Sequence, residues 1–520
     1  MHAVQRGIWP RLAWSLWIAA LVCVPITSSP LLSNSSGGDN PVTPLSLIPF
    51  AGLFLVWLVP YALAGGKLPG WAKPLLAFFA LSLVSAAAAW FLPILPYKDQ
   101  TLLSRELRAL LSFILGIGFY LCASVLPDSE ERIRKSLVAI YLGGVLMLLW
   151  SSVQGWVVLN HADHVPLVIT RIHHLFSVRD PLVDRVTGLA YEPSWLGNQL
   201  MVLYLPLFLA SAIERKSAFP WRRGWLSIET GMLIWAVFIL VLTKARISQL
   251  GFLALLVAIV LVLAWRLLRR AERSLEIRLP RQSRVGQMLL RAASGLTALA
   301  VVAGLVVGAG QAAVRADPRL WALPSMRKYI AEARFLYPND AAFALADRLA
   351  FAERIAYWTA AFRVFSLHPL FGAGPGNAGF FFEQTVPEYG LRLEEIQAVM
   401  REVSFGFPNP KNLWVRLLAE TGIAGFSLFG LWFLGVGLGM ILLWKRGSGY
   451  GRLVGLAGAI VFLTQGVEGF SLDTFALPQM WLVFGLGTAA MWRSGVADPK
   501  PAAGRDRPAP VLSLVDSPAL

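Results

Sequence analysis

Apolar runs of about 20 residues recur along the chain, separated by polar segments. A run of that length, wound into a helix, spans the hydrocarbon core of a bilayer. About twelve such runs are present, near residues 12–28, 44–63, 71–92, 107–126, 137–159, 195–213, 226–243, 249–265, 288–310, 413–443, 453–471 and 474–492. The pattern therefore predicts an all-α polytopic membrane protein with about twelve transmembrane helices.

Two connections between these runs are long, one near 160–194 and one near 311–412. The longer carries eleven Lys or Arg against ten Asp or Glu, a balance that suits a folded cap over a membrane cavity. The chain thus divides into transmembrane helices 1–9 at 1–310, a periplasmic loop domain at 311–412, transmembrane helices 10–12 at 413–493 and a disordered cytoplasmic tail at 494–520.

The longer connection contains a predicted amphipathic helix. Its apolar side chains recur at the spacing of one helical face, at Phe351, Ile355, Trp358, Phe362 and Phe365. The helix ends at His368-Pro369, and the glycines between 372 and 379 then predict a flexible turn. The large loop between spans nine and ten is therefore predicted to be helical.

Composition agrees with a membrane protein. Of the 520 residues, 56% are hydrophobic and 15% are charged, whereas soluble domains are typically about 45–50% apolar and about 25% charged. This excludes a disordered chain, a disulfide scaffold and an ordinary cytosolic enzyme. The two cysteines, Cys23 and Cys122, each lie in an apolar run and cannot form a disulfide framework.

The net charge of +16 is explained by topology. Eight arginines lie between Arg266 and Arg291, where only two acids occur, and further basic residues follow the sixth and tenth runs. Cytoplasmic loops carry such an excess of Lys and Arg. This pattern predicts that both termini are cytoplasmic, that the first run is an uncleaved span and that the two long connections lie outside. The positive charge therefore does not require nucleic-acid binding.

The first candidate site joins Arg185 to Glu192 at the outer end of span six. Glu192 precedes Pro193, which suits the first turn of a helix. Backbone N–H groups at a helix N-terminus, together with an arginine, favour anionic groups such as phosphate. The alternative is a boundary arginine that pairs with Glu192.

The second candidate is the short outer turn with Lys244 and Arg246 between spans seven and eight. Two cations on this side depart from the positive-inside rule. Cations at this depth usually face a cavity, and a diphosphate would pair with them. The alternative is that both side chains simply reach back to the membrane surface.

Further candidates lie around the predicted loop helix. Arg348, Arg354 and Arg363 are either cavity cations or its solvated face, and His368 is either a base or a capping residue. Four histidines in the shorter loop lack carboxylate or cysteine partners at ligand spacing, so no metal site is predicted.

Glu468 and Asp473, near the last outer turn, either line a pathway or cap the turn. Neither a nucleotide-binding nor a redox-cofactor motif occurs.

These residues and their order resemble the bacterial O-antigen ligase and O-antigen polymerase superfamily. Arg185-x-x-x-Leu189 is similar to the family's Arg-x-x-x-Leu motif, and the stretch from Arg354 to Gly376 is similar to its loop sequence. The similarity extends from about residue 185 to 430, while the first five spans match only in hydropathy.

A second motif, at the end of the family's large periplasmic loop, is similar to Lys411-Asn412 followed by Gly422 and Gly425. Ligases of the family have a histidine, the presumed base, where this chain has Lys411. A lysine would instead add positive charge near a diphosphate. The departure favours a polymerase of exopolysaccharide or O-antigen type over a ligase.

The resemblance implies a metal-independent glycosyltransferase without a cofactor. An acceptor hydroxyl attacks a glycan carried on undecaprenyl diphosphate, and the lipid diphosphate leaves. Cations stabilise the leaving charge, and a carboxylate or histidine takes the proton. We assign Arg185, Lys244, Arg246, Arg348 and Arg354 to substrate binding, Glu192 or His368 to the base role, and Lys411 and Asn412 to orienting the reacting groups.

The expected setting is the bacterial inner membrane, with transfer on the periplasmic side. Partners under this hypothesis are the lipid-linked glycan, membrane lipid, and candidate chain-length regulator and flippase proteins. Two alternatives stay open. One is a ligase that transfers glycan to lipid A core or to protein. The other is a lipid-linked sugar transporter or flippase, although no repeated halves with broken helices are found.

Overall fold

The computed structural model describes residues 8–35, 42–224, 226–278, 351–402 and 406–495, with isolated positions between 286 and 347. The predicted ninth span and the first forty residues of the loop domain are described only at such isolated positions, and nearly all of the tail lies outside this description. Every other predicted span contains a helix.

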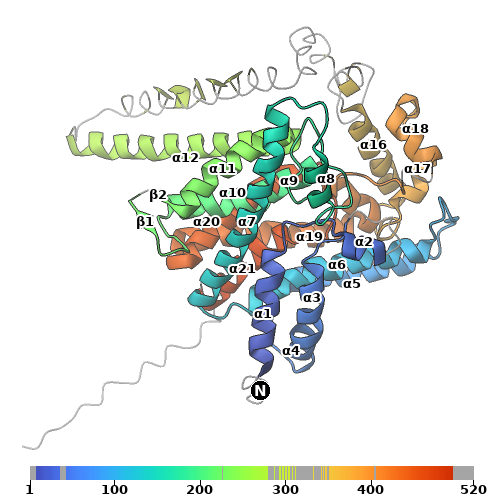
Figure 1. The fold of residues 1–520 in the computed structure, drawn as a ribbon, viewed down its shortest axis with the longest axis horizontal. Helices are drawn as coiled ribbons and strands as arrows, with labels where there is room; N and C mark the ends of the chain where they lie inside the picture. The colour runs from blue at the N-terminus through green and yellow to red at the C-terminus, as the bar shows by residue number, and fades with distance from the viewer. Residues whose placement is uncertain are drawn as a thin grey trace, which may run out of the picture.

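The first half of the chain forms helices joined by turns and loops (Figure 1). In order these are α1 (Ile8–Val22), α2 (Pro30–Ser35), α3 (Leu47–Leu53), η1 (Phe54–Leu58), α4 (Val59–Leu63), α5 (Ala72–Ala89), α6 (Leu102–Val125), α7 (Glu130–Leu159), α8 (Leu167–His173), α9 (Pro193–Gln199), η2 (Leu200–Tyr204), α10 (Leu205–Ile213), α11 (Ile228–Thr243) and α12 (Arg246–Arg278). A two-stranded antiparallel hairpin, β1 (Arg222–Arg223) and β2 (Leu226–Ser227), precedes α11.

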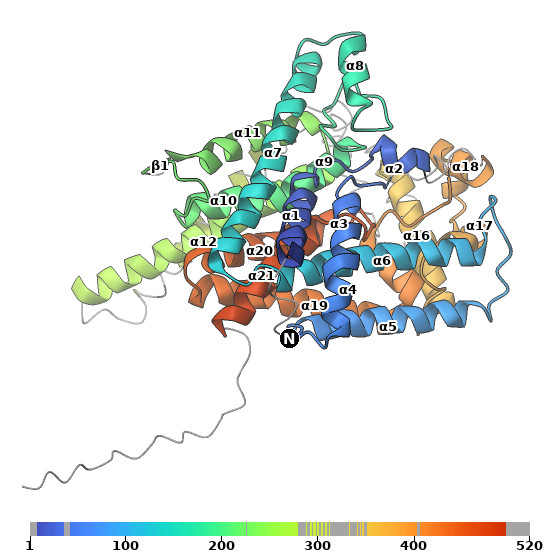
Figure 2. The same cartoon turned by 60° about the horizontal axis from the view of Figure 1, so that its bottom comes forward.

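The second half resumes in the loop domain and returns to the bundle (Figure 2). Its elements are α16 (Ala352–Leu367), η4 (Ala378–Phe381), α17 (Phe382–Thr385), η5 (Gly390–Arg392), α18 (Glu394–Arg401), α19 (Leu413–Arg446), α20 (Gly449–Glu468) and α21 (Gln479–Ser494). The helices from α16 to α18 sit beyond one end of α19, beside the ends of α5 and α6.

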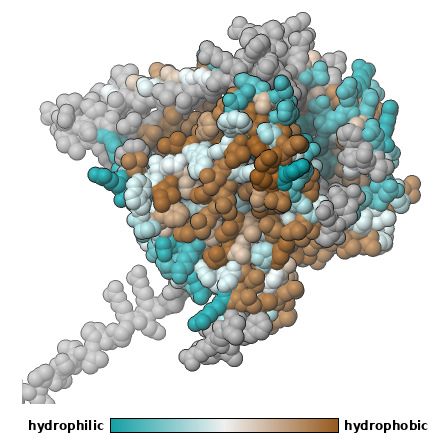
Figure 3. All heavy atoms as spheres, viewed as in Figure 1, coloured by the Kyte–Doolittle hydropathy of each residue, from teal (hydrophilic) through white to brown (hydrophobic). Residues whose placement is uncertain are grey.

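Seven described helices are long and apolar enough to cross a membrane. They are 72–89, 102–125, 130–159, 193–213, 246–263, 413–446 and 449–468. On the face seen in Figure 3, apolar residues cover most of the middle of the surface, and polar residues lie toward its edges. The protein is therefore a helical membrane protein, and the number of twelve spans stays a prediction.

Local sequence signals fix several helix starts. Thr101 and Ser104 bond each other's backbone N–H groups in a capping box at α6. Ser129 caps α7 by accepting from the N–H of Arg132, and Ser227 caps α11 in the same way. Such caps satisfy N–H groups that have no partner within the helix.

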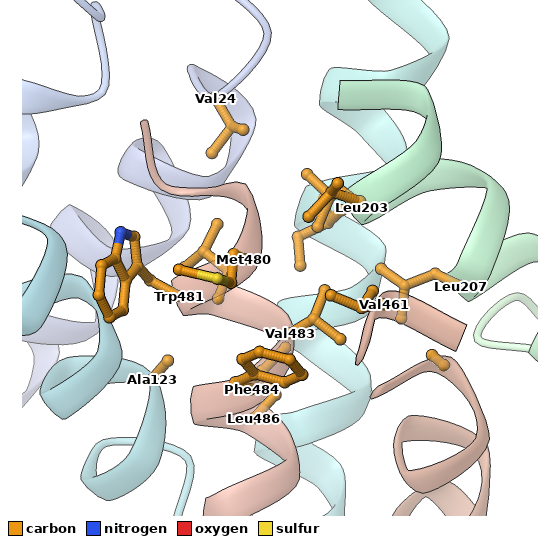
Figure 4. Close-up of a cluster of buried hydrophobic side chains, with 14 of the residues drawn as sticks. Val24, Ala123, Leu203, Leu207, Val461, Met480, Trp481, Val483, Phe484 and Leu486 are labelled. Carbon is orange, nitrogen blue, oxygen red and sulfur yellow. The ribbon is translucent and has the colours of Figure 1, made fainter. Parts of the chain in front are cut away.

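The core forms around α21, which packs against α6, α19, α20 and η2. Figure 4 shows Trp481 and Phe484 of α21 among side chains from neighbouring helices, including Leu203 of η2 and Val461 of α20. Each of these four side chains is at most 1% exposed. A close-packed apolar core of this kind holds α21 and its neighbouring helices in fixed relative positions.

One end of the bundle gathers basic side chains. Here the hydroxyl of Tyr450, at the start of α20, donates to the carbonyl of Ser217 at 2.8 Å. Trp444 near the end of α19 donates to Glu214 at 2.7 Å, and Arg452 pairs with the same carboxylate at 2.6 Å. Since α20 crosses the bundle, its other end at Glu468 lies on the opposite side.

The predicted loop helix exists as α16, but its buried face is different from the predicted one. The aromatic positions are partly exposed, and Phe362 is 46% exposed. The buried face consists mainly of small residues, such as Ala356 and Ala360, with Tyr357. Small side chains let α16 approach α19 closely, so close packing rather than hydrophobicity selects the buried face.

The glycine-rich segment after His368 is fixed in place, so the prediction of a flexible turn is wrong. The N–H groups of Ala373 and Gly374 donate to carbonyls of α19, at Ala419 and Glu420, at 2.8 and 3.0 Å. A Cβ at Gly372 would lie 2.4 Å from the backbone of Glu420. The glycines permit this close contact between two backbones.

Candidate functional site

A cavity of about 670 Å³ opens at the C-terminal end of α20. One wall is lined by the loop 179–185, the starts of α9 and α12, the turn after α11 and the end of α20, and the other by the starts of α16 and α18 (Figure 1). The charged residues that line it are Arg179, Asp184, Arg185, Glu192, Lys244, Arg246, Glu353, Arg354, Glu395 and Glu468. Five cations and five acids from segments far apart in sequence therefore share one space.

Buried Gln154 on α7 positions the loop that carries Arg185. Its side-chain oxygen accepts from the N–H groups of Thr187 and Gly188 at 2.9 and 2.8 Å, and its amide donates to the Gly188 carbonyl at 3.2 Å. The N–H of Val186 also donates to the Leu242 carbonyl near the end of α11, at 3.1 Å. The loop is thus tied to two helices.

Arg185 and Glu192 both line the cavity, but they do not form the ion pair that was one predicted alternative. Arg185 pairs with Asp184 at 3.2 Å. Glu192 pairs with Arg179 at 2.9 Å and accepts from the Ser194 hydroxyl at 3.1 Å. Glu192 occupies the N-cap of α9, with Pro193 as the first helical residue, as the sequence predicted.

Lys244 and Arg246 lie on the same wall, in the turn between α11 and α12. Lys244 adopts a left-handed backbone conformation, with φ of 49°, which ends α11. The N–H of Ala245 donates to the Thr243 hydroxyl at 3.1 Å, so the turn is held. Both cations line the cavity, and their binding of a diphosphate stays a prediction.

The α16 and α18 wall contributes Arg354 and Glu395. Arg354 lies in the first turn of α16, and Glu395 lies in the first turn of α18. The ammonium of Lys411 bonds the Glu395 carboxylate and lies 4.5 Å from the centre of the Tyr357 ring. Lys411 itself does not line the cavity, so it reaches this space only through Glu395.

Glu468 lines the cavity from the end of α20 and is 1% exposed. The side-chain amide of Asn198 on α9 donates to it at 3.4 Å. Close approach of α9 to α12 shapes this region, because a Cβ at Gly197 would lie 2.3 Å from the Ser248 hydroxyl oxygen. Glu468 thus lines the cavity, and its backbone carbonyl also accepts from the N–H groups of Ser471 and Leu472 in the turn after α20, so both predicted roles stay open.

Three predicted residues take other places. His368 lies after the end of α16, on the Phe381 ring, and is separated from Arg354 by roughly 21 Å of helix. Asn412 is fully buried and caps α19 by accepting from two backbone N–H groups. Arg348 lies outside the described residues.

Two of the four histidines in the shorter loop make contacts within the fold. His173 is buried, and its Nδ1 lies 3.2 Å from both the Trp150 indole nitrogen and the Gln154 amide nitrogen. His174 pairs with Asp180 at 2.9 Å. Among the residues that the structure describes, no group of three potential ligand side chains could hold a metal ion.

Sequence reasoning missed Arg179, Glu395 and Gln154. Gln154 carried a usable signal, because a polar side chain within an apolar span commonly has a specific partner. Arg179 and Glu395 carried none, since each is one charge among several in a long polar connection. Only the packing of the loops brings them to the cavity.

Two comparisons with known proteins bear on this site. Residues 231–430 match a family described as O-antigen ligase. The matched segment includes Lys244, Arg246, Arg354 and Glu395 of the cavity. No curated protein matches the chain.

Proposed function

We propose that this member of the O-antigen ligase and polymerase superfamily polymerises oligosaccharide repeat units carried on undecaprenyl diphosphate, on the periplasmic side of the bacterial inner membrane. The family supports the coarser statement of a ligase-like or polymerase-like membrane glycosyltransferase. The cavity and its charges support the finer one.

The observation that carries the proposal is the group of cations at the end of the membrane helices. Lys244, Arg246 and Arg185 lie on one wall and Arg354 on the other. A lipid diphosphate has its charge at this depth, just beyond the hydrocarbon core. Fixed cations stabilise the charge that grows on the diphosphate as its bond to the sugar breaks.

In the proposed reaction, the acceptor hydroxyl oxygen bonds to the anomeric carbon of the donor sugar. The bond between that carbon and the phosphate oxygen breaks, and the diphosphate keeps its electron pair. The hydroxyl proton passes to a protein base. This chain's residues would bind and orient both substrates, and metal independence is part of the proposal.

A ligase that transfers glycan to lipid A core or to protein is the second candidate, because the matched family is described as O-antigen ligase. The same cavity would hold the same donor. The absence of the family's histidine at Lys411 favours the polymerase.

The test supplies purified protein in liposomes with undecaprenyl-diphosphate-linked repeat units, with and without a candidate acceptor. A ladder of growing lipid-linked chains, together with released lipid diphosphate, supports a polymerase. A single transfer that needs the acceptor supports the ligase. Absence of diphosphate release with an authentic donor contradicts both and favours a transporter.

Substitution of the cavity cations tests the diphosphate assignment. We expect Arg246→Ala and Arg185→Ala each to lower the rate of polymer formation by about 10²–10³-fold, the effect of losing one charge-stabilising group. Arg171→Ala is the matched control, since Arg171 is exposed on α8 and does not line the cavity. Full activity of Arg185→Ala in membranes with normal protein content would remove that residue from the site.

A further inference from the structure

The position of the Glu395 carboxylate on α18 is fixed by contacts with two other segments, α16 and the residues just before α19. Lys411, just before α19, bonds it, and the Lys411 ammonium also lies over the Tyr357 ring of α16. The N–H of Lys411 donates to the Asn409 side chain at 3.1 Å, which holds the lysine backbone. The Glu395 side chain is still 44% exposed and lines the cavity. It is therefore both held and accessible.

Three other acids that line the cavity are less suited to accept a proton from substrate. Both oxygens of Glu192 are occupied, by Arg179 and Ser194. Asp184 pairs with Arg185. Glu468 is 1% exposed, and its Oε1 is enclosed.

Glu353 is the remaining acid of the cavity. Among the residues that the structure describes, it makes no hydrogen bond or ion pair, so no neighbour fixes its carboxylate in one position. A catalytic group works best when its neighbours hold it in the productive geometry. Glu395 meets this condition and Glu353 does not.

The wall that carries Glu395 also suits a base. Under the proposed function, Lys244, Arg246 and Arg185, together with Arg354 from α16, hold the leaving diphosphate. An attacking hydroxyl approaches the sugar from the face opposite the leaving group, as water does in inverting glycoside hydrolysis, where a carboxylate activates it. The base must then come from a segment other than the ones that carry these cations, and Glu395 lines the cavity from α18.

We propose that Glu395 is the general base that takes the proton of the acceptor hydroxyl, and that Lys411 is a positioning residue that holds its carboxylate; this rests on the proposed function. The acceptor oxygen bonds to the anomeric carbon as its proton moves to Glu395. The bond from that carbon to the diphosphate breaks, and the proton later leaves to water.

The charges around Glu395 agree with this role. Burial raises the pKa of its carboxyl, but Lys411 and, more weakly, Arg354 and the Tyr357 hydroxyl outweigh burial and bring the pKa below its usual range. On its own helix the adjacent acid is Glu394. The carboxylate is therefore ionised at neutral pH and able to accept a proton.

The experiment measures release of lipid diphosphate in liposomes with donor and acceptor present. Glu395→Gln should lower the rate by at least about 100-fold, within the range typical for loss of a general base, without weakening donor binding. Glu394→Gln is the matched control on the same helix, outside the cavity, and should keep the wild-type rate. Glu395→Asp retains a carboxylate and should keep partial activity, which a mere loss of folding would not allow.

Lys411 is tested by pH dependence. Lys411→Met removes the cation that lowers the Glu395 pKa, so the acid limb of the rate profile should move to higher pH while activity returns in more alkaline buffer. Lys411→Arg should restore the wild-type profile. A purely structural lysine would lower the rate equally at every pH.

The outcomes distinguish failure of the assignment of Glu395 as the base from failure of the proposed function. A wild-type protein that releases no lipid diphosphate overturns the proposed function and the base with it. An active wild type with an equally active Glu395→Gln overturns only the base. Loss of rate in Glu353→Gln, with Glu395→Gln active, moves the role to Glu353.

Discussion

Gln154 shows how a residue outside the cavity sets the geometry inside it. Its side chain bonds three backbone groups of the loop that begins at Arg185, and its amide also meets His173. A buried amide with its hydrogen-bonding groups satisfied in this way specifies one loop conformation, because each unpaired group would cost about 1–3 kcal/mol. The position of the Arg185 charge at the cavity therefore depends on the uncharged, buried hydrogen-bond network of Gln154 and His173.

The neutral state of His173 makes that network sensitive to pH. Burial, with a smaller effect of His174, lowers the pKa of His173 to about 4. In the unfolded chain the pKa is near 6.5, so the unfolded state binds the additional proton between these values. Stability should thus fall as pH falls from about 6.5 to 4, by up to about 3 kcal/mol.

Thermal unfolding of the detergent-purified protein at pH 7.5 and pH 5 measures this effect. His173→Gln should reduce the difference in melting temperature between the two buffers. His161→Gln, at an exposed histidine, should keep it. An unchanged pH difference in His173→Gln would show that another group carries the effect.

At the scale of elements, α19 is two helices joined at Gly422. This residue has φ of 63° and ψ of −171°, a conformation that side chains other than glycine rarely adopt. The N–H of Ile423 donates to the Pro369 carbonyl at 2.9 Å, so the segment after α16 takes up a bond that the break releases. The break therefore connects the loop domain to the membrane helices.

Gly422→Ala should destabilise the protein by more than the roughly 1–3 kcal/mol of backbone strain alone. Its Cβ would lie 2.3 Å from the Leu370 carbonyl oxygen, so the loop segment must also shift. Gly430→Ala is the matched control in the same helix, with no heavy atom within 4 Å of the new Cβ. Thermal unfolding of both variants in detergent measures the difference, and equal melting temperatures would contradict the role given to the break.

At the scale of the molecule, charge and cavity lie at opposite ends of the bundle. Basic side chains such as Lys445 and Arg446 lie in the last turn of α19, whereas the cavity lies at the C-terminal end of α20, on the opposite side of the bundle. Membrane proteins retain Lys and Arg on the cytoplasmic side. The arrangement predicts that the cavity faces the periplasm.

Labelling of single cysteines tests this orientation. In a background with Cys23→Ser and Cys122→Ala, an impermeant thiol reagent applied from the periplasmic side should label Asp163→Cys and not Lys445→Cys, because both positions are exposed on opposite ends. Inverted vesicles should give the reverse pattern. The opposite labelling in both preparations would place the cavity in the cytoplasm.

The sequence by itself determined the class of the molecule and much of the site's composition. Apolar periodicity depends only on local residue order, so the helices at most predicted spans, the outer turn with Lys244 and Arg246, and the start of α9 at Glu192 could be predicted. These features follow from burial of apolar side chains in lipid and from backbone hydrogen bonding within one segment.

Only the tertiary structure decided which charges meet. Glu192 pairs with Arg179 rather than Arg185, Lys411 reaches the cavity through Glu395, and His368 lies a helix length from Arg354. It also decided that α16 buries alanines instead of its aromatic face. Such choices depend on the distance between segments that are remote in sequence, which no local pattern encodes.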